Sequence, residues 1–217
     1  MEKMIEKYNV SRETFFKLKR YESLLKEWQA KFNLVSNNSL ADAWNRHFLD
    51  SLQLFKYIPT KAKKMYDFGS GAGFPGMVIA IVANEKLPNL EINLVESIKK
   101  KTLYLNTVQK ELSVNVNIIN DRIENLPKTH ADVITSRAMC NLKNLLSYAY
   151  PLTTRNTIMI FPKGKTYRQE IDEACKVWNF DYRAEANEIC SDGVILIISN
   201  LFKKELKNAK NNSSCKS

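Results

Sequence analysis

Histidine, cysteine and glycine are scarce in this chain, and long apolar runs are missing. Its 217 residues include 2 His and 4 Cys, and no two cysteines stand in C-x-x-C spacing. Because the familiar zinc motifs need such spacing, we expect no metal site. No apolar run approaches the roughly 18 residues of a membrane span. The start of the chain also has no apolar signal-peptide segment, so we expect a cytoplasmic protein that does not contact a membrane.

Acidic residues are in the minority. The chain has 33 Lys and Arg against 23 Asp and Glu, which gives a net charge of +10 and a pI near 9.4. Such a balance favours a polyanionic partner such as nucleic acid. Most of the excess is lysine, 25 Lys to 8 Arg, which is also typical of AT-rich genomes. The charge alone therefore does not decide the partner.

Four of the six glycines fall in one short stretch, Met65–Gly76. A short apolar run ends there in Asp67, and glycines follow at positions Gly69, Gly71 and Gly73 before a proline opens an apolar helical pattern. Glycine allows a sharp turn and the close approach of a ligand, and proline suits the first turn of a helix. The stretch predicts a strand, a turn and a helix, where open α/β sheets bind nucleotide-like ligands.

Two ligand classes fit this turn. Gly71–Gly76 satisfies the G-x-G-x-x-G pattern of dinucleotide sites, whereas the longer pattern D-x-G-x-G-x-G starts at Asp67. A carboxylate at the strand end would repel a pyrophosphate but suits a ligand with an ammonium group, such as S-adenosylmethionine. Glu96, after the next strand-like run, can accept both ribose hydroxyls in either class. An NAD(P)-dependent oxidoreductase would also need a proton donor such as Tyr-x-x-x-Lys in the appropriate loop, which we do not find.

The hydrophobic periodicity divides the chain into a helical extension, 1–60, and an alternating core, 61–203. Strand-like and helical stretches alternate in the core, which is typical of a parallel sheet with helices on both faces. In the extension we expect helices over 2–33 and 40–58. In the core we expect strands over 65–69, 90–96, 115–120, 131–136, 157–162, 182–189 and 193–202, and helices over 75–85, 98–112, 141–152 and 166–178.

The last two expected strands follow each other without a helix between them. This matches the seven-stranded, mostly parallel sheet of class I S-adenosylmethionine-dependent methyltransferases, whose last strand inserts antiparallel. We therefore predict this Rossmann-like α/β fold with a helical N-terminal extension. The residues over 204–217 are basic, and we predict a disordered tail there.

Three loops that follow predicted strands supply further candidate residues. Ile123 and Glu124 follow the third strand, where this fold lines the adenine; a plain surface loop is an equally good interpretation. Arg137 follows the fourth strand, whose end faces the methyl group and the acceptor, and we favour a catalytic role over a structural ion pair. Lys163 and Lys165 close the fifth strand and could hold acceptor phosphates, which position a nucleic acid without reading its sequence.

The loop after the fourth strand lacks two motifs of other methyl-transfer reactions. It has no Asn/Asp-Pro-Pro-Tyr/Phe to grip an exocyclic amine and no Pro-Cys pair to attack a pyrimidine. Both reactions are therefore disfavoured. His47 lies on a partly apolar helix face, and its spacing alone favours a hydrogen-bonded structural residue. We nevertheless keep it, with Lys163 and Lys165, as a candidate for substrate binding.

Four motifs occur in the order seen in one known family. They are R-H-F-L-D-S-L at Arg46–Leu52, the turn Asp67–Gly76 with F-P-G, S-R-A at Ser136–Ala138, and K-G at Lys163–Gly164. With them the chain resembles the bacterial 16S rRNA guanine-N7 methyltransferases, formerly called glucose-inhibited division protein B. One departure is Phe161–Pro162, where the family often has a small residue and leucine.

The resemblance implies S-adenosylmethionine as methyl donor and N7 of a guanine in small-subunit 16S rRNA as acceptor, in naked rRNA or in a 30S particle. The family's cofactor positions fall here on Gly69, Phe74, Ile123, Glu124 and Arg137. Guanine N7 has a lone pair and no proton, so alignment would matter more than a general base. Arg137 would hold the cofactor or the guanine edge, where O6 is the better contact because N7 must react.

Other interpretations stay open beside this one. The chain could methylate another RNA base, or it could be a non-catalytic rRNA-binding assembly factor that keeps the cofactor fold. We expect the chain to act as a monomer.

Overall fold

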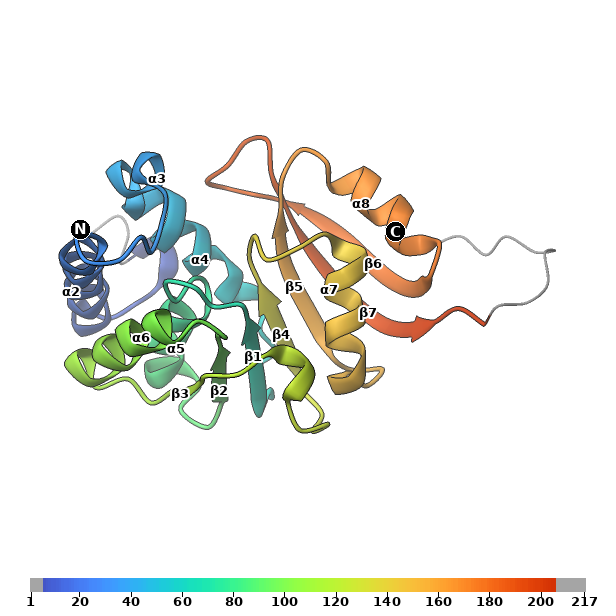
Figure 1. Cartoon of the computed structure of the whole chain (residues 1–217), viewed down its shortest axis with the longest axis horizontal. Helices are drawn as coiled ribbons and strands as arrows, with labels where there is room; N and C mark the ends of the chain where they lie inside the picture. The colour runs from blue at the N-terminus through green and yellow to red at the C-terminus, as the bar shows by residue number, and fades with distance from the viewer. Residues whose placement is uncertain (1–5, 206–217) are drawn as a thin grey trace.

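The computed structural model describes residues 6–205, so from residue 206 on the predicted tail lies outside the described residues. Seven strands form one sheet in the order β3-β2-β1-β4-β5-β7-β6 (Figure 1). All neighbours are parallel except that β7 is antiparallel to β5 and to β6. The predicted sheet is confirmed. The strands are β1 Lys64–Phe68, β2 Glu91–Val95, β3 Asn117–Ile119, β4 Val133–Ser136, β5 Ile158–Lys163, β6 Trp178–Ala186 and β7 Val194–Lys203.

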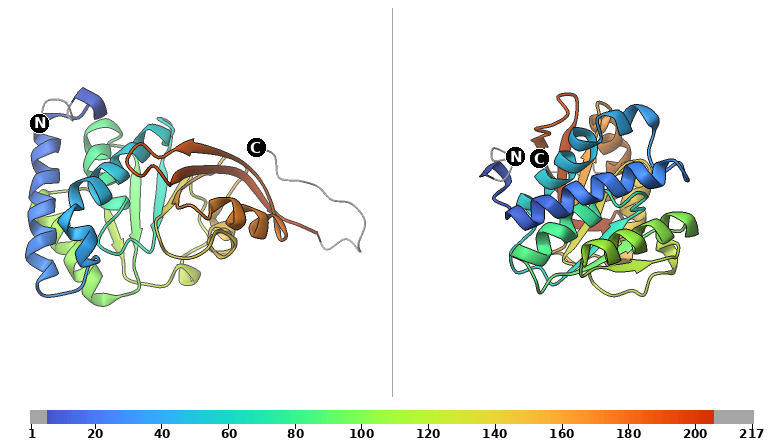
Figure 2. Two further views of the ribbon diagram at one scale, coloured as in Figure 1. Left: turned by 90° about the horizontal axis from the view of Figure 1, so that it is seen from above. Right: turned by 90° about the vertical axis from the view of Figure 1, so that its left-hand side faces the viewer.

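Helices cover both faces of this sheet and enclose two separate apolar cores (Figure 2). On one face lie α5 (Gly76–Lys86) and α6 (Lys99–Leu112), and on the other lie α7 (Leu142–Ala149) and α8 (Tyr167–Cys175). Short 3-10 helices follow β3 and α7, namely η3 Ile123–Asn125 and η4 Tyr150–Leu152. No helix among the described residues is long and apolar enough to cross a membrane, and the same residues hold no cluster of His, Cys, Asp or Glu suited to a metal ion.

The N-terminal extension packs on the α5–α6 face (Figure 2). Its main helix, α2, spans Arg12–Gln29 and starts where the Ser11 hydroxyl accepts a hydrogen bond from the Thr14 amide. The predicted helix over 2–33 is therefore too long. Asn9 has a positive φ of 47°, which interrupts the helical backbone before the cap.

The second predicted helix, 40–58, is also wrong in detail. It consists of α3 (Asn37–Ala41), the π-helix η1 (Trp44–Leu49), the single turn α4 (Asp50–Leu52) and the 3-10 helix η2 (Gln53–Tyr57). Side chains compete here for backbone carbonyls, since the Ser51 hydroxyl donates to the His47 carbonyl at 2.6 Å. Such π-helical turns are frequent at functional sites.

The boundary between α8 and β6 also differs from the prediction. The helix ends at Cys175 instead of residue 178, and the strand begins at Trp178 instead of residue 182. Trp178 is buried and pairs with Lys203 of β7. The strand also ends at Ala186 instead of residue 189, so tertiary pairing shifts it toward the amino end relative to the prediction.

Candidate active site

The glycine turn follows the carboxyl end of β1, and the Asp67 side chain holds it in place. This side chain is fully buried, and its two oxygens accept hydrogen bonds from the Thr135 hydroxyl at 2.7 Å and the Gly76 amide at 3.2 Å. Burial raises the pKa of Asp67 to about 6. From the sequence we expected the Asp67 carboxylate to suit the ammonium group of a ligand. In the structure both of its oxygens bond to the protein, so a ligand would contact the glycine turn that Asp67 positions.

The N-terminal extension braces the same turn from outside. The Tyr21 hydroxyl donates to the Ala72 carbonyl at 2.5 Å, and its ring stacks on Phe74 at 5.4 Å between centroids. Gly73 has a φ of 90°, and a Cβ there would collide with the Tyr21 hydroxyl. The turn and helix α2 are therefore fitted to each other.

A first cavity of about 420 Å³ opens beside this turn, at the carboxyl ends of the strands. Glu96, only 5% exposed, accepts hydrogen bonds from the Gly71 amide at 2.9 Å and the Ile98 amide at 2.8 Å. Its oxygens keep lone pairs for a ligand. Of the predicted cofactor residues, the structure brings five to the wall of this cavity: Gly69, Glu96, Ile123, Glu124 and Arg137. The others, Asp67, Gly71, Gly73 and Phe74, build the turn behind it.

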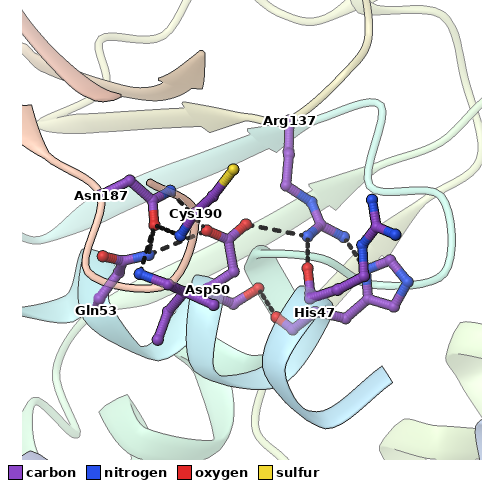
Figure 3. Close-up of polar contacts among 9 residues, drawn as sticks. His47, Asp50, Gln53, Arg137, Asn187 and Cys190 are labelled. Atoms are coloured by element: carbon purple, nitrogen blue, oxygen red, sulfur yellow. Dashed lines mark hydrogen bonds and ion pairs between the residues drawn. The ribbon is translucent and has the colours of Figure 1, made fainter. Parts of the chain in front are cut away.

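Arg137 follows β4 and is held by the segment around His47 (Figure 3). Its Nη1 donates to the Arg46 carbonyl at 2.8 Å and to Asp50 Oδ2 at 3.2 Å. Its Nη2 lies 2.8 Å from Nδ1 of His47, and its guanidinium lies 5.3 Å from the centre of the Phe74 ring. Two N–H groups of the five have no partner among the described residues, so they can serve a ligand.

His47 contacts Arg137 and is not among the residues that line the first cavity. The ring is 8% exposed and stacks on Phe74 at 4.9 Å between centroids. Burial, and then the charges of Arg137 and Arg46, lower the pKa of His47 to about 4. The ring is therefore neutral at physiological pH, and its Nδ1 accepts the hydrogen bond from Arg137.

Asp50 links Arg137 to the loop between β6 and β7 (Figure 3). Its Oδ1 accepts from Gln53 Nε2 at 3.0 Å and from Asn187 Nδ2 at 2.8 Å. The Asn187 side-chain oxygen in turn accepts from the Cys190 amide at 2.8 Å. The position of Arg137 thus depends on a buried carboxylate that also orders the β6–β7 loop.

A second cavity of about 1230 Å³ is lined in part by Arg137–Cys140, the segment that also lines the first cavity. Lys163 borders it with its ammonium group bonded to Glu170 at 2.7 Å and to the Cys140 carbonyl at 3.1 Å. Lys165 is exposed and pairs with Asp192 at 2.8 Å. Arg46 and Lys143 also line this cavity and are exposed.

Sequence patterns did not single out several residues that shape this site. Tyr21, Asp50, Asn187 and Glu170 had no assigned role, although Asp50 lies inside the quoted R-H-F-L-D-S-L motif. Long-range topology brings the others to the site, because Tyr21 and Ala72 lie 51 positions apart and Asp50 and Asn187 lie 137 apart.

Solved structures share this architecture at low sequence identity. A ribosomal protein L11 methylase from Lactobacillus delbrueckii subsp. bulgaricus is 11% identical with a TM-score of 0.57, and the match covers 71% of this chain and 78% of that one. A mutant of MtNAS in complex with S-adenosylmethionine is 14% identical with a TM-score of 0.55, covering 85% and 75%. These likenesses support the predicted fold class.

Relatives of known name match over most of the chain. Ribosomal RNA small subunit methyltransferase G of Ruegeria pomeroyi is 39% identical over 191 residues, which cover 88% of this chain and 93% of the relative. The protein of that name from Orientia tsutsugamushi is 43% identical over 176 residues, covering 81% and 85%. The family model GidB, rRNA small subunit methyltransferase G, matches residues 15–193. The resemblance seen in the sequence is confirmed: the chain belongs to the GidB family of small-subunit rRNA methyltransferases.

Proposed function

We propose that this protein transfers the methyl group of S-adenosylmethionine to N7 of one guanine in 16S rRNA. The observation that carries the proposal is that Arg137–Cys140 lines both a small cavity beside the glycine turn and a large one bordered by the β6–β7 loop. A donor in one cavity and an acceptor base in the other would meet at Arg137. Membership of the GidB family supports an rRNA acceptor.

The first cavity fits the donor by the chemistry of its lining. Glu96 offers carboxylate lone pairs to ribose hydroxyls, half-buried Ile123 offers an apolar surface to an adenine, and Gly69 keeps the backbone close. When bound, S-adenosylmethionine supplies a methyl group on a sulfonium, which is already an activated leaving group. Asp67 and Tyr21 serve this cavity indirectly, by fixing the turn.

The second cavity is large enough for a base that has left its stack. Guanine N7 has a lone pair and carries no proton, so its methylation requires no general base. This agrees with His47, the one histidine near the site, being neutral, buried and bonded to Arg137. Alignment of the reacting atoms then becomes the main contribution of the protein.

Arg137 is the residue to which we assign catalysis. Three acceptors from the N-terminal extension fix its guanidinium, and two of its N–H groups stay free. These groups can bond guanine O6 and leave N7 open to the methyl group. Exposed Arg46, Lys143 and Lys165 are suited to phosphate contacts around the cavity.

We propose that the protein acts as a monomer. An enzyme of 16S rRNA would work in the cytoplasm, on rRNA or on the 30S particle. Unpaired or looped RNA is the expected target, because a duplex hides its base edges in a deep and narrow groove.

A methyl-transfer assay tests the proposal. Labelled S-adenosylmethionine is offered with small-subunit rRNA and with 30S particles from a strain that lacks the modification, and the labelled nucleoside is identified after digestion. The proposal predicts label in 7-methylguanosine. Label in another nucleoside would overturn the N7 assignment, and a protein that binds RNA but not S-adenosylmethionine in calorimetry would be an assembly factor.

A further inference from the structure

Glu170 stands at the second cavity with one oxygen fixed and the other free. Its Oε2 accepts from the Lys163 ammonium group at 2.7 Å and from the Leu142 amide at 2.8 Å. Its Oε1 accepts no hydrogen bond from any residue that the structure describes. The side chain is 21% exposed, whereas that of Lys163 is 9% exposed. A half-buried lysine therefore holds a carboxylate whose second oxygen is available at the cavity.

The other carboxylates of this cavity are arranged differently. Both oxygens of Asp50 are bonded, Oδ1 to Gln53 and Asn187 and Oδ2 to Arg137. Glu173 is exposed and pairs with Lys176 at the end of α8. Asp42 is also exposed, and its Oδ1 accepts from the side-chain amide of Asn45 at 2.7 Å, with no cation bonded to it among the residues that the structure describes. Among these carboxylates, Glu170 combines an ion pair with a half-buried lysine and a free acceptor oxygen.

We infer that Glu170 reads the Watson–Crick edge of the guanine that receives the methyl group; this inference rests on the proposed function. Guanine presents acceptors at O6 and N7 and donors at N1–H and N2–H2. With O6 bonded to Arg137, the two donors are left for an acceptor elsewhere in the same cavity. The free Oε1 has two lone pairs and can accept from both donors. Enzymes that act on unstacked bases commonly read that edge.

The same arrangement would reject the other purine. Adenine has a lone pair at N1 and no amino group at C2, so a carboxylate finds no donor there and is repelled. Lys163, predicted from the sequence to bind phosphate, would instead hold Glu170 in place between β5, α8 and the segment after β4.

Internal competition between guanosine and inosine tests this role. Inosine keeps N7, O6 and N1–H but lacks the 2-amino group. Small-subunit rRNA is transcribed with a small fraction of inosine in place of guanosine and methylated with labelled S-adenosylmethionine. The ratio of 7-methylinosine to 7-methylguanosine, divided by the ratio of inosine to guanosine supplied, gives the relative kcat/KM. The ratio does not depend on how much enzyme is active.

We expect wild-type protein to disfavour inosine by roughly 10- to 100-fold, the value of a hydrogen bond to a charged group. Glu170→Gln keeps the shape and an oxygen for the Leu142 amide but places an NH2 donor where the free Oε1 stood. The acceptor for the guanine 2-amino group is lost, so discrimination should fall to within about threefold of none. The matched control is Asp172→Asn, an exposed acid of α8 that does not line this cavity, which should discriminate like wild type.

Two results would overturn the inference. Wild-type protein could methylate inosine as readily as guanosine, which requires no variant to interpret. Glu170→Gln could lose activity yet keep the full preference for guanosine, which would make Glu170 a structural residue only. Failure of the proposed function itself has a separate signature, namely no label from wild-type protein in either 7-methylated nucleoside.

Discussion

Nη2 of Arg137 lies 2.8 Å from Nδ1 of His47, and this contact joins the N-terminal extension to the loop after β4. The neutral imidazole is the acceptor, because its pKa is lowered to about 4 by burial and by neighbouring arginines. The extension therefore does more than cover the sheet. It fixes the direction of the side chain to which we assign the reaction.

Replacement of His47 should separate its two contacts. His47→Phe keeps a ring against Phe74 but removes the acceptor for Arg137, so kcat/KM should fall roughly 10- to 100-fold. His47→Asn places an amide oxygen close to the position of Nδ1 and should retain more activity than His47→Phe. Steady-state kinetics on 30S particles measure both variants. Equal loss of kcat/KM in the two would show that activity does not depend on the hydrogen bond from Arg137 to His47.

Two buried groups should give opposite pH dependences of stability. The pKa of His47 is about 4 when folded, below its ordinary 6.5, so its contribution to stability is lost as the pH falls from about 6.5 to about 4. The pKa of Asp67 is about 6 when folded, above its ordinary 3.8, so its contribution is lost as the pH rises from about 4 to about 6. Each shift corresponds to about 3 kcal/mol at most.

Urea unfolding between pH 4 and pH 6.5 checks these signs. Relative to wild type, Asp67→Asn should gain free energy of unfolding as the pH rises, and His47→Phe should lose it. In wild type the two slopes oppose each other and largely cancel. Differences from wild type that stay constant across this range would contradict both pKa shifts.

Removal of the Glu96 carboxylate should weaken donor binding. Glu96→Ala leaves the Gly71 and Ile98 amides without their acceptor and removes the group proposed to bind ribose, so Kd for S-adenosylmethionine should rise at least roughly tenfold. Calorimetry measures the change. Glu91→Ala, at the exposed amino end of β2, the strand that precedes Glu96, is the control and should bind normally. Unchanged binding in Glu96→Ala would remove Glu96 from the site.

The fit between Tyr21 and the glycine turn can be measured as a coupling. Gly73→Ala should cost about 2–4 kcal/mol of stability, because φ is positive and the new Cβ meets the Tyr21 hydroxyl. Tyr21→Phe alone should cost about 1 kcal/mol through the lost bond to Ala72. In the Tyr21→Phe background the cost of Gly73→Ala should drop by more than about 0.5 kcal/mol. Strict additivity would mean that the hydroxyl does not set the requirement for glycine.

Local signals in the sequence were enough to predict the sheet and the glycine turn. Strand periodicity, the spacing of Gly69, Gly71 and Gly73, and the paired final strands all lie within short windows. The breaks in the N-terminal helices were not predictable in this way. The π-helix around His47 involves an interaction of the Arg46 carbonyl with Arg137, 91 positions away.

The sequence also could not predict the roles of residues whose partners are distant along the chain. In the sequence, nothing distinguishes Lys163 from a lysine that is free to bind phosphate. Only the packed structure shows that Glu170 and the Cys140 carbonyl bind its ammonium group. The spacing of His47 favoured a structural role. The structure shows that His47 contacts Arg137, the residue to which we assign catalysis. Asn187 has no sequence signal, because its loop reaches Asp50 only through the β6–β7 pairing.

The account depends most directly on Arg137, which borders both cavities. Single-turnover methyl transfer by Arg137→Ala, at saturating S-adenosylmethionine and with 30S particles as acceptor, tests it. We predict a rate at least roughly 100-fold below wild type, with Kd for S-adenosylmethionine changed little, because the free N–H groups act on guanine O6. A wild-type rate with normal donor binding would contradict the central role of Arg137.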